Sequence, residues 1–205
     1  MKIISPSFTI SNPLEEIEIL KRIEAAGRLC YKSEHKINED SAYKFVQNII
    51  ARGHESVLEH EKITAVIICD RGVSHEIVRH RIASYSQEST RYCNYTGEKF
   101  NKELTFIKPV FWKEDSKLYG IWEKEMRSIE NAYFEMIENK ASPQEARSIL
   151  PNSLKTEIAA TMNIRQWRHF LKLRTAPASH PQMIEIASQI LTKFKSLYPV
   201  LFGDI

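Results

Sequence analysis

The chain is poor in glycine and cysteine and has no long hydrophobic run. Its six glycines lie at positions 27, 53, 72, 97, 120 and 203, so no glycine-rich loop is available to cradle a phosphate. Three widely spaced cysteines predict neither a disulfide framework nor a thiolate metal site, and they fit a reducing cytoplasm. Because no window approaches the roughly 18 apolar residues of a membrane span, we expect a soluble, unprocessed protein.

An excess of one charge is also absent. The 29 lysines and arginines nearly balance the 26 aspartates and glutamates, giving a net charge of +3. Such a balance does not favour a protein that coats nucleic acid, so any anion site must be local. The length of 205 residues is most simply one domain, residues 1–205, large enough to bury its own core.

Two common kinds of catalytic site find little support. The histidines of the pairs His54/His60 and His75/His80 are six and five residues apart, whereas a helical zinc motif needs four, so no metal is predicted. Cysteine nucleophilic catalysis is disfavoured because Cys69 lies in an expected strand and Cys30 on an expected apolar helix face. Only Cys93, in a polar segment, is expected to be accessible.

Hydrophobic periodicity and capping residues predict alternating strands and helices. Asn12 precedes Pro13 as an expected cap for the first helix, and Ser74 is expected to cap a helix that carries the arginines after it. A polar segment from 84 to 97 is expected to be a long, functional loop. We expect strands near residues 2–4, 63–69, 104–107 and 156–162, and further helices near 14–31, 41–52, 116–139, 142–150, 165–173 and 181–198.

The segment from Glu76 to Tyr92 has the composition of an anion-binding site. It holds three arginines, one histidine, two tyrosines and several hydroxyl side chains, and it contains no lysine. Arginines can grip phosphate or carboxylate in a fixed geometry. A second group, Arg147, Arg165, Arg168 and Arg174, lies far along the chain. Taken singly, each of these arginines would more often be an ordinary surface residue.

The spacing Arg79-His80-Arg81, then Ser84, Ser89 and Arg91, resembles the signature of the flavin-dependent thymidylate synthases. The similarity covers most of residues 40 to 195. Its other blocks, in the order and spacing of that family, are Gly53-His54-Glu55-Ser56 with Glu59-His60, Ala146 to Pro151, Met162 to Arg165, Arg168-His169-Phe170, and Leu173-Arg174 to His180.

This resemblance implies an enzyme that methylates dUMP to dTMP. The implied methylene donor is 5,10-methylenetetrahydrofolate, with FAD as redox carrier and NADPH as reductant. It also implies a single α/β domain with a central mixed or antiparallel sheet flanked by helices, assembled as a homotetramer with sites between subunits. The missing cysteine nucleophile agrees with chemistry driven by reduced flavin.

The resemblance assigns the site residues position by position. The implied FAD contacts are Ser56, Arg79, His80, Arg81, Gln87, Asn163, Ile164, Arg165 and His169. The implied dUMP contacts are Glu76, Ile77, Val78, Arg79, Gln87, Glu88, Ser89, Thr90, Arg91, Arg147 and Arg174. At Glu76, Gln87 and His169 the family often has glutamine, glutamate and asparagine instead, so this chain departs there from the commonest pattern.

Charge suggests a division of labour among these residues. Arg91 with Ser89 suits the dianionic phosphate of dUMP, and Arg174 looks like the residue that faces the uracil. A guanidinium there would stabilise negative charge on the base, which makes Arg174 the predicted catalytic residue. His54 either orients the flavin or holds its own turn.

Two other functions remain as alternatives. Arginines and tyrosines of the 76–92 segment could contact a nucleic acid, in which case binding would weaken steeply with salt. A flavoprotein reductase could use the same cofactor for another substrate, and its bound flavin would then not respond to dUMP.

Overall fold

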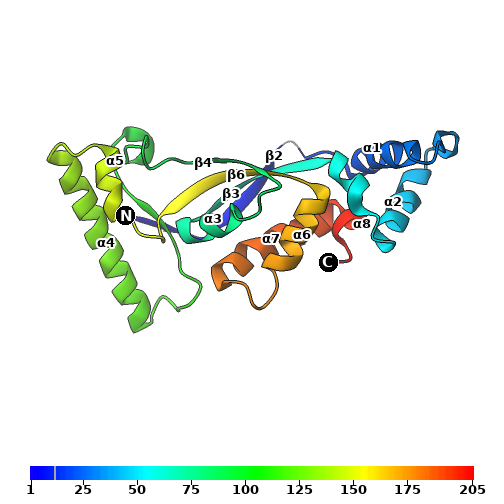
Figure 1. The fold of residues 1–205 in the computed structure, drawn as a ribbon. Coiled ribbons are helices and arrows are strands. Elements are labelled where there is room, and N and C mark those ends of the chain that lie inside the picture. The colour runs from blue at the N-terminus through cyan, green and yellow to red at the C-terminus, as the bar shows by residue number, and fades with distance from the viewer. Residues whose placement is uncertain (12) are drawn as a thin grey trace. The chain divides into compact units, whose positions relative to one another are not determined.

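The computed structural model of the chain describes residues 1–11 and 13–205, so Asn12, the expected helix cap, lies outside the described residues. The chain divides into two compact units, each with its own internal contacts. Figure 1 shows the ribbon of the chain. Unit 1 comprises residues 1–7, 67–79 and 86–158, and unit 2 comprises residues 8–66, 80–85 and 159–205. A single domain over residues 1–205 stays a prediction.

A four-stranded sheet has the order β2-β3-β6-β4. Its inner strands, β3 (Lys62–Asp70) and β6 (Lys155–Asn163), each pass from one unit into the other. Both were predicted from their β-branched and small residues. For β3 the continuous apolar run of residues 63–69 also predicts burial on both faces of the strand. Instead its burial alternates, because Ile63, Ala65, Ile67 and Cys69 are buried and the residues between them are half-buried.

The edge strands were not predicted. β2 (Ser7–Ser11) alternates between exposed and half-buried residues, and β4 (Ser84–Gln87) lies in the segment that was predicted to be a loop. The Ser-Tyr-Ser-Gln sequence of β4 has no apolar run, because an edge strand with half-buried side chains does not need one. With helices beside these sheets, the mixed α/β class is confirmed.

Unit 1 contains a second, two-stranded sheet. β1 (Lys2–Ile4) runs parallel to β5 (Thr105–Ile107), with Lys2 opposite Thr105. Two helices, α4 (Lys117–Glu138) and α5 (Pro143–Ala146), pack together in this unit, and short 3₁₀ turns lie at Glu98–Phe100 and Arg147–Ile149. The buried core of this part of the unit consists of Tyr95, Leu104, Phe106, Met126, Tyr133, Ala146 and Leu154.

Capping explains where three helices of unit 1 begin. Ser116 accepts a hydrogen bond from the Tyr119 amide at 3.2 Å. The sequence Ser142-Pro-Gln-Glu145 predicts a capping box, and Ser142 and Glu145 form it. For α3 (Arg71–Ile77) the prediction was wrong, since the carboxylate of Asp70, and not Ser74, caps the helix by accepting from the Val73 amide at 2.8 Å. α3 ends at Ile77, so Arg79 and Arg81 follow the helix and are not carried on it.

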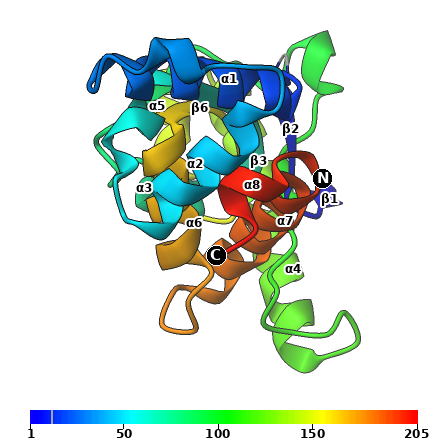
Figure 2. The same ribbon diagram turned by 90° about the vertical axis from the view of Figure 1, so that its right-hand side faces the viewer.

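Unit 2 is built mainly of helices, which face the viewer in Figure 2. The helix of residues Glu16–Leu29 (α1) packs on that of Ser41–Ala51 (α2). The helix of Ile164–Arg174 (α6) packs on that of Pro181–Leu197 (α7), which also packs on Pro199–Phe202 (α8). Trp167 is fully buried, donates from its indole nitrogen to the Ile63 carbonyl at 2.9 Å, and lies edge-on against Phe170 and Phe194. The elements are α1 (Glu16–Leu29), η1 (Glu34–Lys36), α2 (Ser41–Ala51), η2 (Glu55–His60), α6 (Ile164–Arg174), α7 (Pro181–Leu197) and α8 (Pro199–Phe202).

The ends of these helices test the sequence predictions. The sequence predicts that Gly53, directly after the helical residues 41–52, ends this helix. Gly53 follows α2 with a φ of +69°, which confirms the prediction. For α1 the sequence predicts an apolar stripe of Leu14, Ile17, Leu20 and Ile23, closed by Cys30 or Tyr31. Leu20 and Ile23 are buried as predicted, together with Ile19, whereas Leu14 and Tyr31 are 40% and 81% exposed.

All three cysteines are free. Cys69 is buried as predicted, but Cys30 is exposed at the end of α1 and does not lie on a buried helix face. Burial raises the pKa of the Cys69 thiol, which keeps it protonated. Within the described part of the chain, no helix is both long enough and apolar enough to span a bilayer.

Candidate functional site

The predicted site residues fall into two groups, one in each unit. Unit 1 holds most of the expected substrate contacts: Glu76, Ile77, Val78, Arg79, Gln87, Glu88, Ser89, Thr90, Arg91 and Arg147. Unit 2 holds most of the expected cofactor contacts together with the predicted catalytic arginine: Ser56, His80, Arg81, Asn163, Ile164, Arg165, His169 and Arg174.

In unit 1 the chain at the end of β4 is held by buried and half-buried polar contacts. Gln87 donates from its side-chain nitrogen to the hydroxyls of Ser74, at 2.9 Å, and Thr156, at 3.1 Å. Ser74 in turn donates to the carbonyl of Arg71 at 2.9 Å. Because Ser74 and Thr156 are fully buried, this network fixes the backbone direction at Gln87.

Glu88 is the centre of a second network in unit 1. Its carboxylate accepts from the Lys155 ammonium at 2.9 Å and from the Tyr95 hydroxyl at 3.1 Å, and its amide donates to the Glu157 carbonyl at 2.8 Å. Burial, reinforced by the Glu88 charge, raises the pKa of Tyr95. Burial alone would lower the pKa of Lys155, but its bonds to Glu157 and Glu88 outweigh it and raise that pKa. Glu88 is thus committed to protein contacts.

A tight turn follows Glu88 and exposes Arg91. The Ser89 hydroxyl accepts from the Arg91 amide at 3.3 Å, and the Ser89 carbonyl accepts from the amides of Tyr92 and Cys93. Thr90 is buried, whereas Arg91 is exposed and its guanidinium lies 5.2 Å from the centre of the Tyr92 ring. The turn therefore presents Arg91 to solvent while its neighbours anchor it.

The other predicted contacts of unit 1 differ in exposure. Ile77 is fully buried, so its side chain belongs to the core, whereas Val78 is 37% exposed. Arg79 and Arg147 are exposed, and Glu76 is half-buried. Only the exposed or half-buried members of this group can offer side chains to a ligand without a rearrangement.

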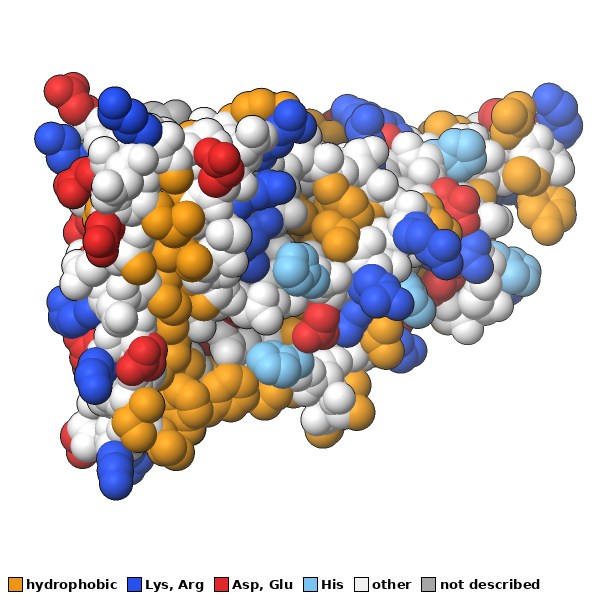
Figure 3. Space-filling model, turned by 60° about the vertical axis from the view of Figure 1, so that its left-hand side comes forward, with side chains coloured by type: hydrophobic (Ala, Val, Ile, Leu, Met, Phe, Trp, Pro, Cys, Tyr) orange, Lys and Arg blue, Asp and Glu red, His pale blue; other side chains and the backbone are white. Residues whose placement is uncertain are grey.

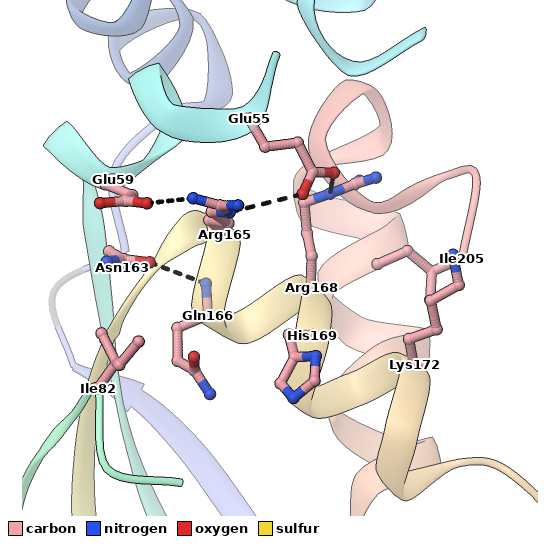
Figure 4. A pocket seen from close by; sticks show the side chains of 10 residues that line it. All are labelled: Glu55, Glu59, Ile82, Asn163, Arg165, Gln166, Arg168, His169, Lys172 and Ile205. Carbon is pink, nitrogen blue, oxygen red and sulfur yellow. Dashed lines mark hydrogen bonds and ion pairs between the residues drawn. The ribbon is translucent and has the colours of Figure 1, made fainter. Parts of the chain in front are cut away.

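In unit 2 a pocket of about 520 Å³, here called the α6 pocket, lies against α6 and η2 (Figure 4). It brings together three of the predicted cofactor contacts, Asn163, Arg165 and His169. Asn163 also caps α6, since its side-chain oxygen accepts from the Gln166 amide at 2.8 Å. The full lining is Glu55, Glu59, Ile82, Asn163, Arg165, Gln166, Arg168, His169, Lys172 and Ile205.

Ion pairs hold two of the arginines at this pocket in place (Figure 4). Arg165 meets Glu59 at 2.6 Å and Glu55 at 3.9 Å. Arg168 is buried, contacts Glu55 at 3.3 Å, and makes a two-pronged contact with Asp204, with both N–O distances 2.7 Å. Hydrogen bonding from Arg168 lowers the pKa of Asp204. Arg168 therefore ties the C-terminal residues to α6, and Arg165 is the more exposed of the two.

His80 and Arg174 are joined by a direct hydrogen bond. The Nε of Arg174 donates to the Nε2 of His80 at 2.9 Å, and the other ring nitrogen lies 3.3 Å from the side-chain amide of Gln166. The His80 ring is 7% exposed and packs edge-on against Phe170 and His169. Burial, then the charges of Arg174 and His169, lower the pKa of His80 from 6.5 to about 4. His80 is therefore neutral at pH 7 and accepts from the arginine.

The remaining predicted residues of unit 2 lie elsewhere. Ile164 is fully buried and its amide donates to the Glu61 carbonyl at 2.9 Å. Arg81 is exposed and is not among the residues that line the α6 pocket. Ser56 lines a second pocket, together with its neighbours His54 and Val57.

Several lining residues were missed by the sequence reasoning. Gln166 and Lys172 line the α6 pocket, and Glu55 and Glu59 supply the carboxylates that hold its arginines. Gln166 could have been found, because it lies three residues from both Asn163 and His169 on one helix, and such residues share a face. The pairing of Glu59 with Arg165, 106 residues away, has no local signal in the sequence.

The α6 pocket suits an extended ligand with phosphate and hydroxyl groups. Arginine, lysine, histidine and asparagine side chains supply donors around its rim, and the exposed Ile82 supplies an apolar contact. Two carboxylates, from Glu55 and Glu59, moderate the positive charge. The donors come from a helix and from ion-paired side chains, so they are already oriented before a ligand binds.

Comparison with known proteins identifies the family. The family described as thymidylate synthase complementing protein matches residues 14–200. A protein of Pyrococcus furiosus named flavin-dependent thymidylate synthase is 39% identical over 87% of this chain and 73% of its own length. A protein of the same name from Geobacter sulfurreducens is 33% identical over 89% of this chain and 80% of its own.

A solved structure supports the fold. The UMP/dUMP methylase PolB of Streptomyces cacaoi superposes with a TM-score of 0.79 at 22% identity, covering 99% of this chain and 96% of that one. At this identity the likeness establishes the fold alone. The match over residues 14–200 and the similarity to the sequence relatives place the chain in the thymidylate synthase complementing protein family.

Proposed function

We propose that this protein is a flavin-dependent thymidylate synthase that converts dUMP to dTMP. FAD would carry the electrons, 5,10-methylenetetrahydrofolate would supply the methylene group, and NADPH would be the reductant. The observation that carries the proposal is the bond between Arg174 and His80, because it joins two blocks of the family signature that lie 94 residues apart. The family and the names of its relatives give the reaction.

The flavin is proposed to bind at the α6 pocket. When bound, it would supply the reducing equivalents that turn a transferred methylene group into a methyl group. The chain's part is to hold and orient this group: Asn163 and His169 offer hydrogen-bonding side chains, and Arg165 offers a positive charge fixed by Glu59. The residues present fit a phosphate-bearing cofactor without a glycine-rich loop.

The nucleotide phosphate is proposed to bind at the turn from Gln87 to Arg91. Buried contacts of Gln87 and Glu88 hold the turn, and Arg91 is exposed at its end. A guanidinium suits a phosphate dianion because it presents several donors in a fixed fork. In a homotetramer this turn would contribute to the site of a neighbouring subunit. There the uracil is proposed to face Arg174, whose charge would stabilise negative charge that develops on the base during methylation.

Arg91→Ala is expected to weaken dUMP binding roughly tenfold or somewhat more, because a charge-assisted hydrogen bond to phosphate is lost. Arg91 is exposed, so the fold should be unaffected. Titration of dUMP into the flavin-loaded protein, followed by the change in flavin absorbance, measures the dissociation constant. Arg127→Ala is the matched control, since Arg127 is an exposed arginine of unit 1 that pairs with Glu123. Equal dissociation constants for Arg91→Ala and wild type would remove Arg91 from the phosphate site.

The proposed reaction has a direct test. The purified protein should absorb as a flavoprotein and oxidise NADPH only in the presence of dUMP and methylenetetrahydrofolate, forming dTMP. A protein that binds flavin and oxidises NADPH without regard to dUMP would be a flavoprotein reductase. A protein that cannot be reconstituted with FAD and binds nucleic acid in a salt-dependent way would belong to the other alternative class.

We also propose that the protein is a homotetramer, as its family resemblance implies. Exposed hydrophobic side chains on unit 1 support this assembly. Val110, Phe111, Leu118 and Ile121 are each between 46% and 55% exposed, and hydrophobic side chains gather on the side of unit 1 that carries α4 (Figure 3). Such patches are typical of interaction surfaces. Light scattering should give a mass about four times 23.9 kDa, and a monomer would contradict the proposal.

A further inference from the structure

A second pocket in unit 2, here called the basic pocket, lies between α1, α2 and η2 and has a volume of about 690 Å³. Four of its lining residues are basic: Arg28, Lys36, Arg52 and His54. Of the described residues that line it, none carries a carboxylate. The α6 pocket differs, because Glu55 and Glu59 lie among its cations.

No carboxylate among the described lining residues neutralises the positive charge of the basic pocket. Arg28 pairs with the buried Glu24 at 2.8 Å, so its charge is already balanced. Lys36 and Arg52 are exposed, and their side chains have no ion-pair or hydrogen-bond partner in the part of the chain that the structure describes. Two positive charges therefore face the pocket uncompensated, and His54 adds a further donor.

Two aromatic side chains, Phe45 and Tyr31, line this pocket. The Arg28 guanidinium carbon lies over the Phe45 ring, 4.7 Å from its centre, and Tyr31 is 81% exposed. Gly27 lets the Phe45 ring take this position, because a Cβ on residue 27 would come within 2.6 Å of the ring. Cations beside flat apolar surfaces suit a ligand that combines an anionic group with a ring or chain.

Residues of η2 line both pockets of unit 2. Glu55 lines the α6 pocket and Ser56, the next residue, lines the basic pocket. A molecule that reacts at a flavin in the α6 pocket could therefore place its remote end in the basic pocket. Binding energy from such a remote group is commonly used to hold a reactant in position.

We propose that the basic pocket binds the anionic end of a co-substrate that reacts with the flavin, through Lys36 and Arg52. This inference rests on the proposed function, and the ligand chemistry it names is an oxyanion, either carboxylate or phosphate. Two co-substrates of that function carry such groups remote from their reacting atoms. They are the γ-glutamyl tail of the folate and the 2′-phosphate of NADPH.

The first test is calorimetric titration of the flavin-loaded protein with inorganic pyrophosphate. Lys36→Ala/Arg52→Ala is expected to raise the dissociation constant roughly tenfold or more, because two charged donors are lost. The matched control is Lys21→Ala/Lys44→Ala, which removes two positive charges from α1 and α2 at positions outside the pocket lining. Absence of pyrophosphate binding to wild type, or an equal loss in the control, overturns the proposal.

The second test distinguishes the sources of the oxyanion. If the pocket holds the folate tail, the double variant loses the preference for triglutamyl over monoglutamyl methylenetetrahydrofolate and keeps its KM for NADPH. If it holds the nucleotide phosphate, the variant loses the preference for NADPH over NADH and keeps its KM for folate. Retention of both preferences overturns the proposal.

The first test fails separately from the proposed function. Pyrophosphate titration needs neither dUMP nor turnover, so it reports on the pocket even in a protein that forms no dTMP. An active enzyme whose wild type does not bind pyrophosphate would leave the proposed reaction standing and remove the pocket's assigned role.

Discussion

Arg174→Ala is expected to lower turnover of dUMP by about a hundredfold or more, while FAD remains bound. The physical reason is electrostatic: removing an oriented donor from developing negative charge typically costs that much, and the loss falls on the chemical step. Arg174 is half-buried at the end of α6 and is held by His80, so its orientation is set before the substrate arrives. Single-turnover measurements with flavin-loaded protein separate this effect from substrate binding.

The control for this prediction is Arg174→Lys. Lysine keeps the positive charge but lacks the planar fork, so it cannot donate to the His80 ring and to a second acceptor in the same plane. An intermediate turnover is therefore expected for Arg174→Lys, below wild type and above Arg174→Ala. Flavin content, read from absorbance, should be unchanged in both variants. Turnover of Arg174→Ala within a fewfold of wild type would contradict a catalytic role for this arginine.

Local signals in the sequence predicted much of the helical structure. The capping box of Ser142 and Glu145, and Gly53 after α2, act within a few residues of the helix ends that they define. Such short-range interactions can be read directly from a sequence. β3 and β6 were predicted from their β-branched and small residues, which suit the interior of a sheet, and both are inner strands of the sheet.

The elements that were missed depend on partners far along the chain. β4 has a polar sequence and forms a strand only because the sheet offers it an edge beside β6. For α3 the sequence predicted Ser74 as the cap, but Asp70 caps the helix because β3 ends at that residue. That end is determined by sheet pairing, which propensity does not describe.

The candidate site shows the same division. The family signature located the residues, including Asn163, Arg165 and His169, which meet at one pocket. It did not indicate that Glu59 holds Arg165, because that pairing depends on how η2 packs against α6. Roles inferred from the signature remain proposals, whereas burial now shows which side chains, such as Ile77 and Ile164, belong to the core.

His80→Leu is expected to lower turnover roughly a hundredfold, although the residue need not touch the reacting atoms. Leucine removes the acceptor that holds the Arg174 Nε, and small displacements of a catalytic group can cost about this much. The same change leaves Gln166 without its ring partner in a buried position and should destabilise the fold by about 2 kcal/mol. His80 would thus be a positioning residue for Arg174.

His80→Gln separates positioning from mere packing. A glutamine side chain can place an oxygen near the position of Nε2 and accept from Arg174, but it cannot be protonated. Turnover of His80→Gln at pH 7.5 should therefore exceed that of His80→Leu by about tenfold, with equal flavin content and matching circular dichroism spectra. Equal turnover in the two variants would mean that the acceptor does not matter.

The pH dependence of stability gives an independent readout of the same bond. The pKa of His80 is about 4 in the fold against 6.5 as the ordinary value, so between these values the unfolded chain binds the proton more tightly. The neutral ring therefore contributes stability that is present above pH 6.5 and is lost as the pH falls toward 4. This contribution should decrease by about 1 kcal/mol between pH 7 and pH 5.5.

His80→Gln should lack this part of the pH dependence, because an amide does not titrate in this range. Urea unfolding of wild type and His80→Gln at a series of pH values measures it, since all other titrating groups are shared and cancel in the difference. On acidification, the unfolding free energy of the wild type should fall by about 1 kcal/mol more than that of His80→Gln. This result would support a buried, neutral His80. Parallel pH profiles would show instead that the ring is as easily protonated in the fold as in the unfolded chain, and that the Arg174 bond does not depend on its neutral form.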